Sequence, residues 1–536
     1  MPLTKKIVIP ITLLLIISIN LSGCILDDLL GNASFSLTSS SIIDNEGFPA
    51  LKIFYSCKGM ITLKLFDPSS KVLDTDLFFT GEASAILNLG SYRQTIKAGT
   101  YTLKAFNKNN DEIFSKTYSY KNSDITILSC SQKWWKNSGD YKLIGLELSI
   151  QNNRKVPIYP YDLTFFIDSE TTEGLIIPNV ILPGNIDTIY CTLYKDNIPS
   201  EDSFTISLND IDGYNLATST FTVDTTPNVN SRSFTKGVEN TLYLPYPDFL
   251  YNYYHGLDRY LHEDYGIYVF DQYDDIYLDI FCDCLFSTLP FGQRNYNSKG
   301  DVEKIEFVAS FVQGLKYKKD SLTNDSFEYP NYPIETLFTG SGGGDCEDKS
   351  ILLASILDKL GFKTALFRLP SHMAIGVELG ENSVSGYEYY TGSYYYLETT
   401  TEGKPLGFIP NDYKNPSDLT IHKISSRELL LHNWVDDSLT IYTDTDIGDV
   451  VKVELIAENL GRIKAENIEL KGAFSTQYTN NHIKSETKTI SLISPGSKEK
   501  IILIVDIPKS YTTVFKTYLL YNGKTVEFKE SASTFP

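Results

Sequence analysis

The sequence predicts a multidomain chain in which a central α+β domain lies between all-β modules. Its 536 residues are too many for one hydrophobic core, and a hydrophobic content of 42% supplies apolar side chains for several cores. Both ends of the chain consist of short runs in which apolar and polar residues alternate between turn residues, a pattern typical of strands. The middle instead carries apolar residues at helical spacing. We therefore expect β-sandwich modules on both sides of a mixed domain.

The N-terminus, residues 1–23, has the pattern of an export signal. Two lysines form a short basic region, Ile7 to Ile19 form an apolar region, and small residues precede Cys24. This arrangement resembles a lipoprotein signal peptide. The resemblance implies cleavage before Cys24, lipid attachment to its thiol and a lipidated tether over residues 24–32, so we expect a lipid anchor on the extracytoplasmic face of a cell membrane. The alternative is an uncleaved anchor helix, for which the apolar run is short.

Residues 33–122 and 123–224 are predicted to form two successive β-sandwich modules, because strand-like runs alternate with turn residues throughout both ranges. The clearest strands are Ala50–Cys57, Met60–Phe66 and Thr100–Phe106 in the first module, and Gly145–Ile150, Leu163–Ile167 and Thr188–Leu193 in the second.

Residues 225–236 are predicted to be a linker because they contain the turn-favouring residues Pro227, Asn228 and Asn230. The last module, residues 434–536, has strand patterns over Val450–Ala457 and Lys500–Asp506. Its pattern is similar to the immunoglobulin-like domains of surface proteins.

Residues 237–433 are predicted to form the α+β domain. Asp301 to Tyr317 carries an apolar stripe at helical spacing, which predicts a helix that faces a core. Ile351 to Leu360 predicts a second helix, ended by Gly361 in a left-handed conformation. Three strands are then predicted, over Thr364–Leu369, His372–Leu379 and Tyr394–Thr400.

A glycine-rich turn places Cys346 in the first turn of the second helix. A helix N-terminus favours a thiolate over a thiol and offers N–H donors for an oxyanion, so this is the setting of a nucleophile. The alternative is a small buried hydrophobe, but three successive glycines and the flanking acids do not describe a core. We expect Asp345 and Asp348 to cap the helix. Their charge and that of Glu347 should raise the thiol pKa and also favour the imidazolium form of His372, so the sequence leaves the net effect on a thiolate–imidazolium pair open.

His372 begins one predicted strand, and Glu398 lies near the end of the next. If these strands are antiparallel neighbours, both side chains meet at the helix end that carries Cys346. The chemistry then assigns three roles. The thiolate attacks an acyl carbon, His372 stores and returns the proton, and Glu398 fixes the imidazole tautomer.

At these residues the chain resembles the transglutaminase-like superfamily of papain-related cysteine enzymes. Three motifs carry the resemblance in order, GGGDCEDKSILLASILDKLG, LPSHMAIGV and YYYLETT, within roughly Gly237 to Ser425. The resemblance implies a papain/transglutaminase-like α+β fold with Cys346, His372 and Glu398 as the triad. The third residue is usually Asp in this family, so Glu398 makes the side chain longer by one methylene.

Gln313 is a candidate for the second oxyanion donor, and the alternative is a solvated polar position on its helix. No metal site is expected, because Cys282 and Cys284 are the only His or Cys pair with ligand spacing and they lack partners. No cofactor is expected either. We expect ordinary surface or packing roles for the other histidines.

The formal net charge of −20 argues against nucleic-acid binding, which needs a basic face, and it suits a solvated surface protein. Apart from Cys24 and Cys346 the chain has five cysteines, an odd number that excludes complete pairing. A bridge between Cys130 and Cys191 within one β-module is open from the sequence.

Two functional hypotheses follow from the sequence. The first is a membrane-anchored, extracytoplasmic cysteine hydrolase or acyl transferase that acts on a protein, peptide or cell-envelope substrate through an acyl-thioester. Water as acceptor gives a protease or amidase, and an amine gives a transglutaminase. The second is a catalytically inactive transglutaminase-like scaffold whose β-modules bind a partner. The intact triad favours the first, although a fold alone does not establish activity.

Overall fold

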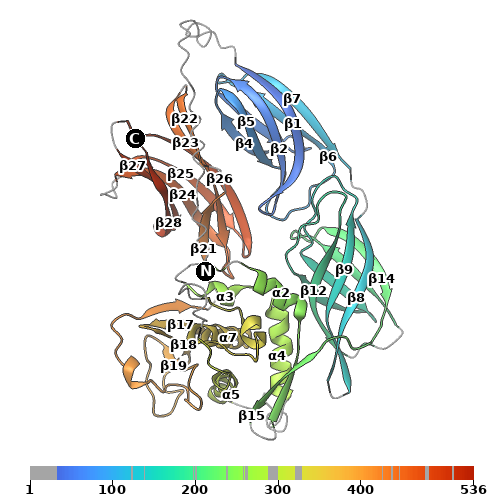
Figure 1. Cartoon of the computed structure of the whole chain (residues 1–536), viewed down its shortest axis with the longest axis vertical. Coiled ribbons are helices and arrows are strands. Elements are labelled where there is room, and N and C mark those ends of the chain that lie inside the picture. The colour runs from blue at the N-terminus through green and yellow to red at the C-terminus, as the bar shows by residue number, and fades with distance from the viewer. Residues whose placement is uncertain are drawn as a thin grey trace.

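The computed structural model consists mostly of antiparallel β-strands, with a group of helices near the middle of the chain (Figure 1). Among the residues that it describes, no helix is long and apolar enough to cross a membrane. The expected signal peptide, Cys24 and the tether lie outside the described residues. The structure describes residues 33–121, 125–137, 139–196, 198, 202–236, 240–257, 259, 264–287, 300–319, 329–424, 427–435, 439–445, 447–476, 482–509 and 512–535.

The first β-module consists of two antiparallel sheets that pack around one core. Its strands are β1 (Ser34–Asn45), β2 (Phe48–Lys58), β3 (Ile61–Phe66), β4 (Val72–Phe78), β5 (Gly81–Asn88), β6 (Gly99–Phe106) and β7 (Glu112–Tyr120). The sheet orders are β1-β2-β5 and β4-β3-β6-β7. Ile61, Leu63 and Leu65 alternate along β3 as fully buried residues, because one face of the sheet lies on the core.

The second β-module differs from the two-sheet sandwich expected from the sequence. Its strands are β8 (Ile125–Asn137), β9 (Asp140–Asn152), β10 (Asp162–Ile167), β11 (Glu170–Ile176), β12 (Ile186–Asp196), β13 (Ser203–Asn209) and β14 (Asn215–Thr222). They form one sheet in the order β14-β13-β10-β11-β12-β9-β8. Gln132 of β8 donates from Nε2 to the carbonyl of Thr222 on β14 at 2.9 Å, which joins the two edges. The sheet therefore rolls around its own core.

The cysteines of the second module are free thiols. Cys191 of β12 lies opposite Leu146 of β9, and Cys130 of β8 lies opposite Leu148 of the same strand. Two strand spacings of about 4.8 Å therefore separate the two cysteine positions. This separation exceeds the reach of a disulfide, so the bridge considered from the sequence does not form.

Part of the predicted linker is a strand. β15 (Ser231–Lys236) pairs with β16 (Asn240–Pro245) as an antiparallel hairpin. Phe234 of β15 packs against Phe311 of the helical unit, with 5.6 Å between ring centroids. The polar composition of the segment concealed this strand, because its stabilising contact comes from a residue distant in sequence.

The α+β unit combines six helices with a four-stranded antiparallel sheet among the described residues. The helices are α2 (Asp248–Gly256), α3 (Ile267–Phe270), α4 (Asp275–Ser287), α5 (Asp301–Gln313), α6 (Pro333–Phe338) and α7 (Cys346–Lys359), and η2 (Asn411–Tyr413) is a 3-10 turn. The strands are β17 (Thr364–Leu369), β18 (His372–Glu378), β19 (Tyr394–Leu397) and β20 (Thr420–Lys423), in the order β19-β18-β17-β20. Ser350 to Leu357 of α7 are all buried, and α7 contacts α5, α6, β17 and β18. This helix is the centre of the unit.

The last module again has two sheets around a core that includes Val451, Val453 and Leu503. Its strands are β21 (Leu430–Trp434), β22 (Thr440–Thr445), β23 (Gly448–Asn459), β24 (Ala465–Thr476), β25 (His482–Ile493), β26 (Ser497–Asp506), β27 (Thr513–Tyr521) and β28 (Lys524–Phe535). In one sheet β23 pairs with β21, β22 and β26, and the other sheet has the order β25-β24-β27-β28.

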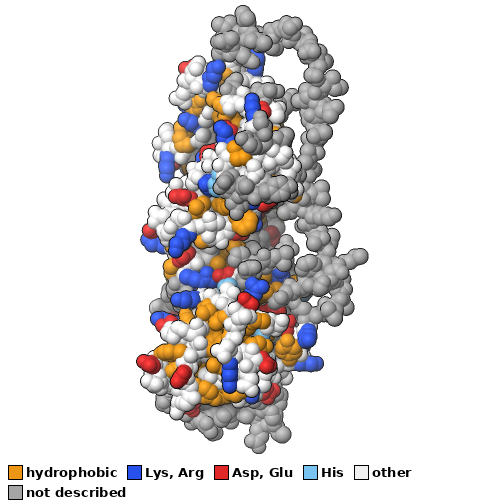
Figure 2. Space-filling model, turned by 90° about the vertical axis from the view of Figure 1, so that its left-hand side faces the viewer, with side chains coloured by type: hydrophobic (Ala, Val, Ile, Leu, Met, Phe, Trp, Pro, Cys, Tyr) orange, Lys and Arg blue, Asp and Glu red, His pale blue; other side chains and the backbone are white. Residues whose placement is uncertain are grey.

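Charged residues join the last module to the rest of the chain. Lys452 of β23 forms a buried ion pair with Asp76 of β4, with 2.5 Å between Nζ and Oδ1. Arg462 pairs with Asp275 of α4 and Asp358 of α7 at 3.3 and 3.0 Å. The last module therefore lies beside both the first module and the α+β unit (Figure 1). On the face drawn in Figure 2, cationic and anionic side chains are interspersed.

Candidate functional site

The backbone conformation of the turn before Cys346 requires glycine. Gly343 has a φ of +105°, and a Cβ at this position would lie 2.0 Å from the carbonyl oxygen of Lys316. The N–H of Gly344 donates to that carbonyl at 3.2 Å, and the Gly344 carbonyl accepts from the N–H of Lys318 at 3.0 Å. A larger residue at position 343 cannot make this close approach. The turn therefore holds the start of α7 against the 316–318 segment.

Asp345 caps α7, so Cys346 is the first residue of the helix, as predicted. Asp345 donates from its backbone N–H to the carboxylate of Asp348 at 3.3 Å, and the reciprocal contact completes a capping box. Gly361 follows the helix with a φ of +85°, the left-handed conformation that the sequence predicted.

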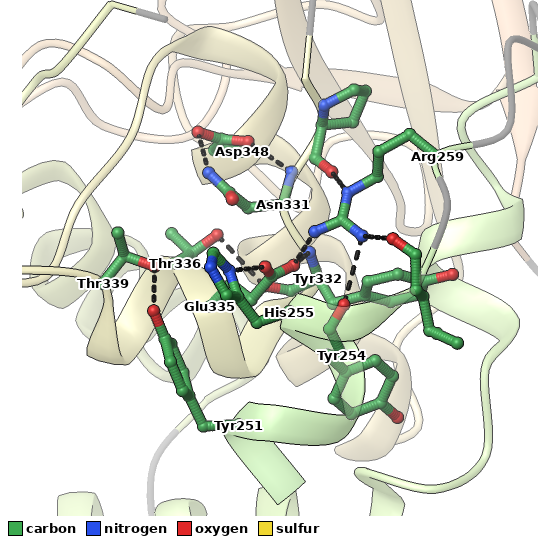
Figure 3. Close-up of polar contacts among 12 residues, drawn as sticks. Tyr251, Tyr254, His255, Arg259, Asn331, Tyr332, Glu335, Thr336, Thr339 and Asp348 are labelled. Atoms are coloured by element: carbon green, nitrogen blue, oxygen red, sulfur yellow. Dashed lines mark hydrogen bonds and ion pairs between the residues drawn. The ribbon is translucent and has the colours of Figure 1, made fainter. Parts of the chain in front are cut away.

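Polar contacts behind the site tie α7 to α6 (Figure 3). Asp348 accepts hydrogen bonds from the backbone N–H and the side-chain amide of Asn331, each at 2.7 Å. Asn331 lies just before α6, in which the fully buried Glu335 pairs with Arg259 at 2.5 Å and with His255 at 3.2 Å. His255 thus lies within hydrogen-bond distance of the buried Glu335, a contact that joins α2 to α6.

The Cys346 thiol is half-buried and donates a hydrogen bond to Oε2 of Glu347, with 3.2 Å between sulfur and oxygen. Burial raises the thiol pKa well above its usual range, and the charge and hydrogen bond of Glu347 raise it further. The backbone N–H of Met373 lowers it, but less strongly. The resting sulfur is therefore a neutral thiol, in line with the acidic surroundings seen in the sequence.

His372 and Glu398 meet as expected for antiparallel neighbours. β18 pairs with β19, and Glu398 follows the last residue of β19. Nε2 of His372 lies 3.2 Å from Oε2 of Glu398, and the two side chains are 9% and 3% exposed. The longer side chain of Glu, compared with the Asp of the resembled family, therefore reaches the imidazole.

Hydrogen-bond donors surround the Glu398 carboxylate. Oε1 accepts from the backbone N–H groups of Thr399 and Thr400 at 3.1 and 2.9 Å and from the Thr400 hydroxyl at 2.5 Å. Oε2 accepts from the Tyr396 hydroxyl at 2.9 Å. Burial alone would raise the pKa of Glu398, but the hydrogen bonds from His372 and Thr400 outweigh it and lower the pKa to about 2. Glu398 is therefore an anion at neutral pH.

The Cys346 thiol lies beside the start of β18, because the backbone N–H of Met373 is close enough to lower the thiol pKa. The ring of Tyr413 connects the three parts of the site. It stacks on His372 with 4.7 Å between centroids, and its pKa is raised by burial and then by the negative charges of Glu398 and Asp412. Within the described residues, the hydrogen-bond partner of the thiol is Glu347 and not His372.

Gln313 is buried and does not face the thiol. Its Nε2 donates to the backbone carbonyls of Glu398 and Lys404, each at 2.9 Å, and its Oε1 accepts from the Gly403 N–H at 3.0 Å. Both amide hydrogens are engaged, so the side chain has no free N–H to offer an oxyanion. It holds the loop after β19 instead, a role that differs from the predicted donor and from a solvated position.

Tyr317 and Tyr413 flank the site and were missed by sequence reasoning. Tyr317 is 45% exposed, and a parallel bridge to Gly344 fixes it beside the glycine turn. The pKa of Tyr317 is raised to about 12, mainly by burial and secondly by the proximity of Cys346. The chain has 37 tyrosines, and no local pattern distinguishes these two.

Three carboxylates in the first turn region, those of Asp345, Glu347 and Asp348, lie with ligand oxygens within 4.8 Å of one another. Oxygen donors of this kind suit a hard cation. From the sequence these three acids are expected to cap the helix and to act on the thiol, and no metal-ligand role is expected of them. In the structure Glu347 accepts a hydrogen bond from the Cys346 thiol, and Asp348 accepts one from the N–H of Asn331. These two acids are therefore already engaged in hydrogen bonds at the start of α7.

No protein-family model and no curated protein matches the chain. Among solved structures, a red sea bream transglutaminase is 10% identical, with 74% of this chain and 80% of that chain covered and a TM-score of 0.21. An exo-chitosanase of Amycolatopsis orientalis is 8% identical, with 90% and 76% covered and a TM-score of 0.15. A β-glucosidase from intestinal bacteria is 12% identical, with 28% and 20% covered and a TM-score of 0.14. Similarity at these TM-scores carries no argument about activity.

Proposed function

We propose that this chain is a cysteine hydrolase or acyl transferase of the transglutaminase-like type, with Cys346, His372 and Glu398 as its triad. The observation that supports it best is the buried His372–Glu398 pair, at 3.2 Å, beside a cysteine on the first turn of a helix. An anionic acid, an imidazole and a thiol in this order are the groups that acyl transfer through a thioester requires.

The chemistry follows from the contacts. Glu398 holds Nε2 of His372, which leaves Nδ1 as the acceptor of the Cys346 proton. The sulfur attacks the acyl carbon, the bond to the leaving amine or alcohol breaks, and the imidazolium returns its proton to that leaving group. Water or a second amine then attacks the thioester carbon and releases the thiol. The first N–H groups of α7 are suited to the oxyanion.

The proposal extends to location and substrate. We propose that the lipoprotein-like N-terminus anchors the protein by lipid on Cys24 at the extracytoplasmic face of a membrane, where it meets protein, peptide or cell-envelope substrates. The net charge of −20 makes nucleic acid an unsuitable partner. Detergent partitioning of the wild type and of Cys24→Ser tests the anchor. A wild-type protein that stays in the aqueous phase with residues 1–23 intact would contradict it.

One experiment separates the reaction types. The ectodomain is incubated with a peptide library, with and without a primary amine, and the products are read by mass. Replacement of the leaving amine by water indicates hydrolysis, and its replacement by the added primary amine indicates transfer. Cys346→Ala is the matched control, because Ala suits a helix and removes only the sulfur. Equal turnover in the control would reject the nucleophile.

One observation favours a second candidate, a noncatalytic surface scaffold. The resting thiol is neutral and bonds to Glu347 rather than to His372. Labelling with iodoacetamide near neutral pH distinguishes the candidates, since alkylation requires a thiolate or a base that removes the proton. Fast, selective labelling of Cys346 supports the enzyme, and an inert Cys346 supports the scaffold.

A further inference from the structure

A buried amide joins α5 to the loop that carries the acid of the site. Gln313 is the last residue of α5 and is 3% exposed. Its three hydrogen bonds, to the carbonyls of Glu398 and Lys404 and from the N–H of Gly403, hold the first part of the loop after β19, residues 398–404. The backbone of Glu398 is therefore fixed from a helix, while its carboxylate is fixed by its own loop.

A buried ammonium lies behind this amide. Lys349 of α7 is 1% exposed and donates from Nζ to the carbonyls of Gln313 and Leu315, at 3.1 and 3.0 Å. Carbonyls at a helix C-terminus lack intrahelical donors, and a cation suits this negative end of the helix. Lys349 thus holds the backbone of the residue whose side chain holds Glu398.

The charge of Lys349 is also part of the electrostatics of the site. Burial lowers the pKa of Lys349 to about 8, and the charges of Glu398 and Glu402 act in the opposite direction. The same helix therefore carries Cys346 at its start and, one turn later, Lys349, whose charge interacts with that of Glu398. Both ends of the nucleophile–acid arrangement are tied to α7.

We propose that Gln313 and Lys349 are positioning residues that act on the site through Glu398. The proposal rests on the proposed function, because it assigns these residues a part in that same site. The physical reason for the proposal is the short distance that the Glu398 carboxylate must keep from His372. The Glu398 carboxylate must stay 3.2 Å from His372 Nε2, and displacement of a reacting group by about 1 Å costs on the order of 10²-fold in rate.

The test is a double-mutant cycle. Gln313→Leu keeps the shape of the side chain and removes its hydrogen bonds, and Glu398→Ala removes the carboxylate through which Gln313 is proposed to act. The readout is the rate of Cys346 alkylation by iodoacetamide from pH 5 to 10, measured by peptide mass. We expect Gln313→Leu to slow alkylation on the order of 10²-fold in the wild-type background and by less than about twofold in Glu398→Ala. Equal slowing in both backgrounds would mean a general structural role and would overturn the proposal.

A crystal structure tests the positioning role without relying on the reactivity of Cys346. We expect a crystal structure of Gln313→Leu to show the His372–Glu398 contact opened beyond hydrogen-bond distance. An unchanged contact with an unchanged alkylation rate would also overturn the proposal. If wild-type Cys346 is inert, the proposed function fails, and the crystal structure alone then decides the positioning role.

Further variants guard against misfolding and non-specific effects. Glu306→Gln is the matched control, because Glu306 of the same helix accepts from the Leu406 N–H at 3.1 Å and an amide oxygen can replace it. It should retain the wild-type alkylation profile. If Gln313→Leu does not fold, Gln313→Glu places a carboxylate against two carbonyls at the same size and should give the same loss. Lys349→Met should reproduce the pattern, whereas a wild-type profile in it would remove Lys349 from the proposal.

Discussion

The charge of Glu347 acts on the Cys346 thiol more directly than any other carboxylate in the described structure, because it also accepts the thiol hydrogen bond. The folded-state pKa of the thiol is raised, so the sulfur stays protonated at pH values where a free cysteine is partly ionised. Removing the carboxylate charge should lower that pKa.

We therefore expect Glu347→Gln to shift the alkylation profile of Cys346 to lower pH and to speed alkylation near neutral pH by about tenfold, the effect of one pKa unit. Glu381→Gln, in an exposed turn, is the control and should leave the profile unchanged. If the two variants match the wild type, Glu347 does not control the thiol.

Glu398 gives a second prediction at the residue scale. Oε1 faces two backbone N–H groups that cannot accept a hydrogen bond, so the oxygen of a Gln at this position must lie there. Its NH2 group would then face Nε2 of His372 and favour the wrong tautomer. We expect Glu398→Gln and Glu398→Ala both to lose on the order of 10²-fold or more in turnover.

The measurement is turnover from pH 5 to 9 with folding checked separately. Because the pKa of Glu398 is lowered to about 2, Glu398 itself does not titrate in this range, and the shape of the profile reports other groups. Wild-type rates in Glu398→Ala would point to another acid, and Glu402 would be tested next.

At the scale of the element, the turn before α7 decides whether Cys346 is placed correctly. Gly343→Ala would put a Cβ 2.0 Å from the Lys316 carbonyl oxygen at a φ of +105°. We expect this substitution to destabilise the turn by roughly 1–3 kcal/mol through backbone strain, with the clash added. The urea concentration at which Cys346 becomes rapidly alkylated should fall.

Gly340→Ala is the matched control, since Gly340 also has a positive φ but its Cβ would meet only Lys318 Nζ at 3.6 Å. It should shift the urea dependence less than Gly343→Ala. The opposite order would show that the close approach to Lys316 is not what requires glycine.

At the scale of the whole molecule, the Lys452–Asp76 pair joins the first and last modules. Both side chains are almost completely buried, so removal of one partner leaves an uncompensated charge. We expect Asp76→Leu to destabilise the contact by roughly 3–5 kcal/mol, whereas Asp76→Leu with Lys452→Met should cost much less. Thermal unfolding monitored by proteolysis between the modules checks this, and an equal cost for the single and double variants would contradict it.

Much of the site could be predicted because its signals are local. Asp345 and Asp348 are three residues apart and form the capping box, and Gly361 ends the helix as its position indicated. The His372–Glu398 contact followed from strands that are neighbours in sequence. The position of Phe234 in a strand did not follow, because its partner Phe311 lies far along the chain.

The sequence by itself determined the β-rich multidomain architecture, the start of α7 at Cys346 and the order of the three site residues, since periodicity, capping and turns act between near neighbours. Only the tertiary structure decided that Gln313 holds the Glu398 loop, that Tyr413 stacks on His372 and that Glu347 takes the thiol hydrogen bond. These contacts depend on how distant elements approach and on which rotamer each side chain adopts. Burial at that approach is the largest cause of the raised Cys346 pKa, whereas the smaller effect of the adjacent Glu347 was predictable from the sequence.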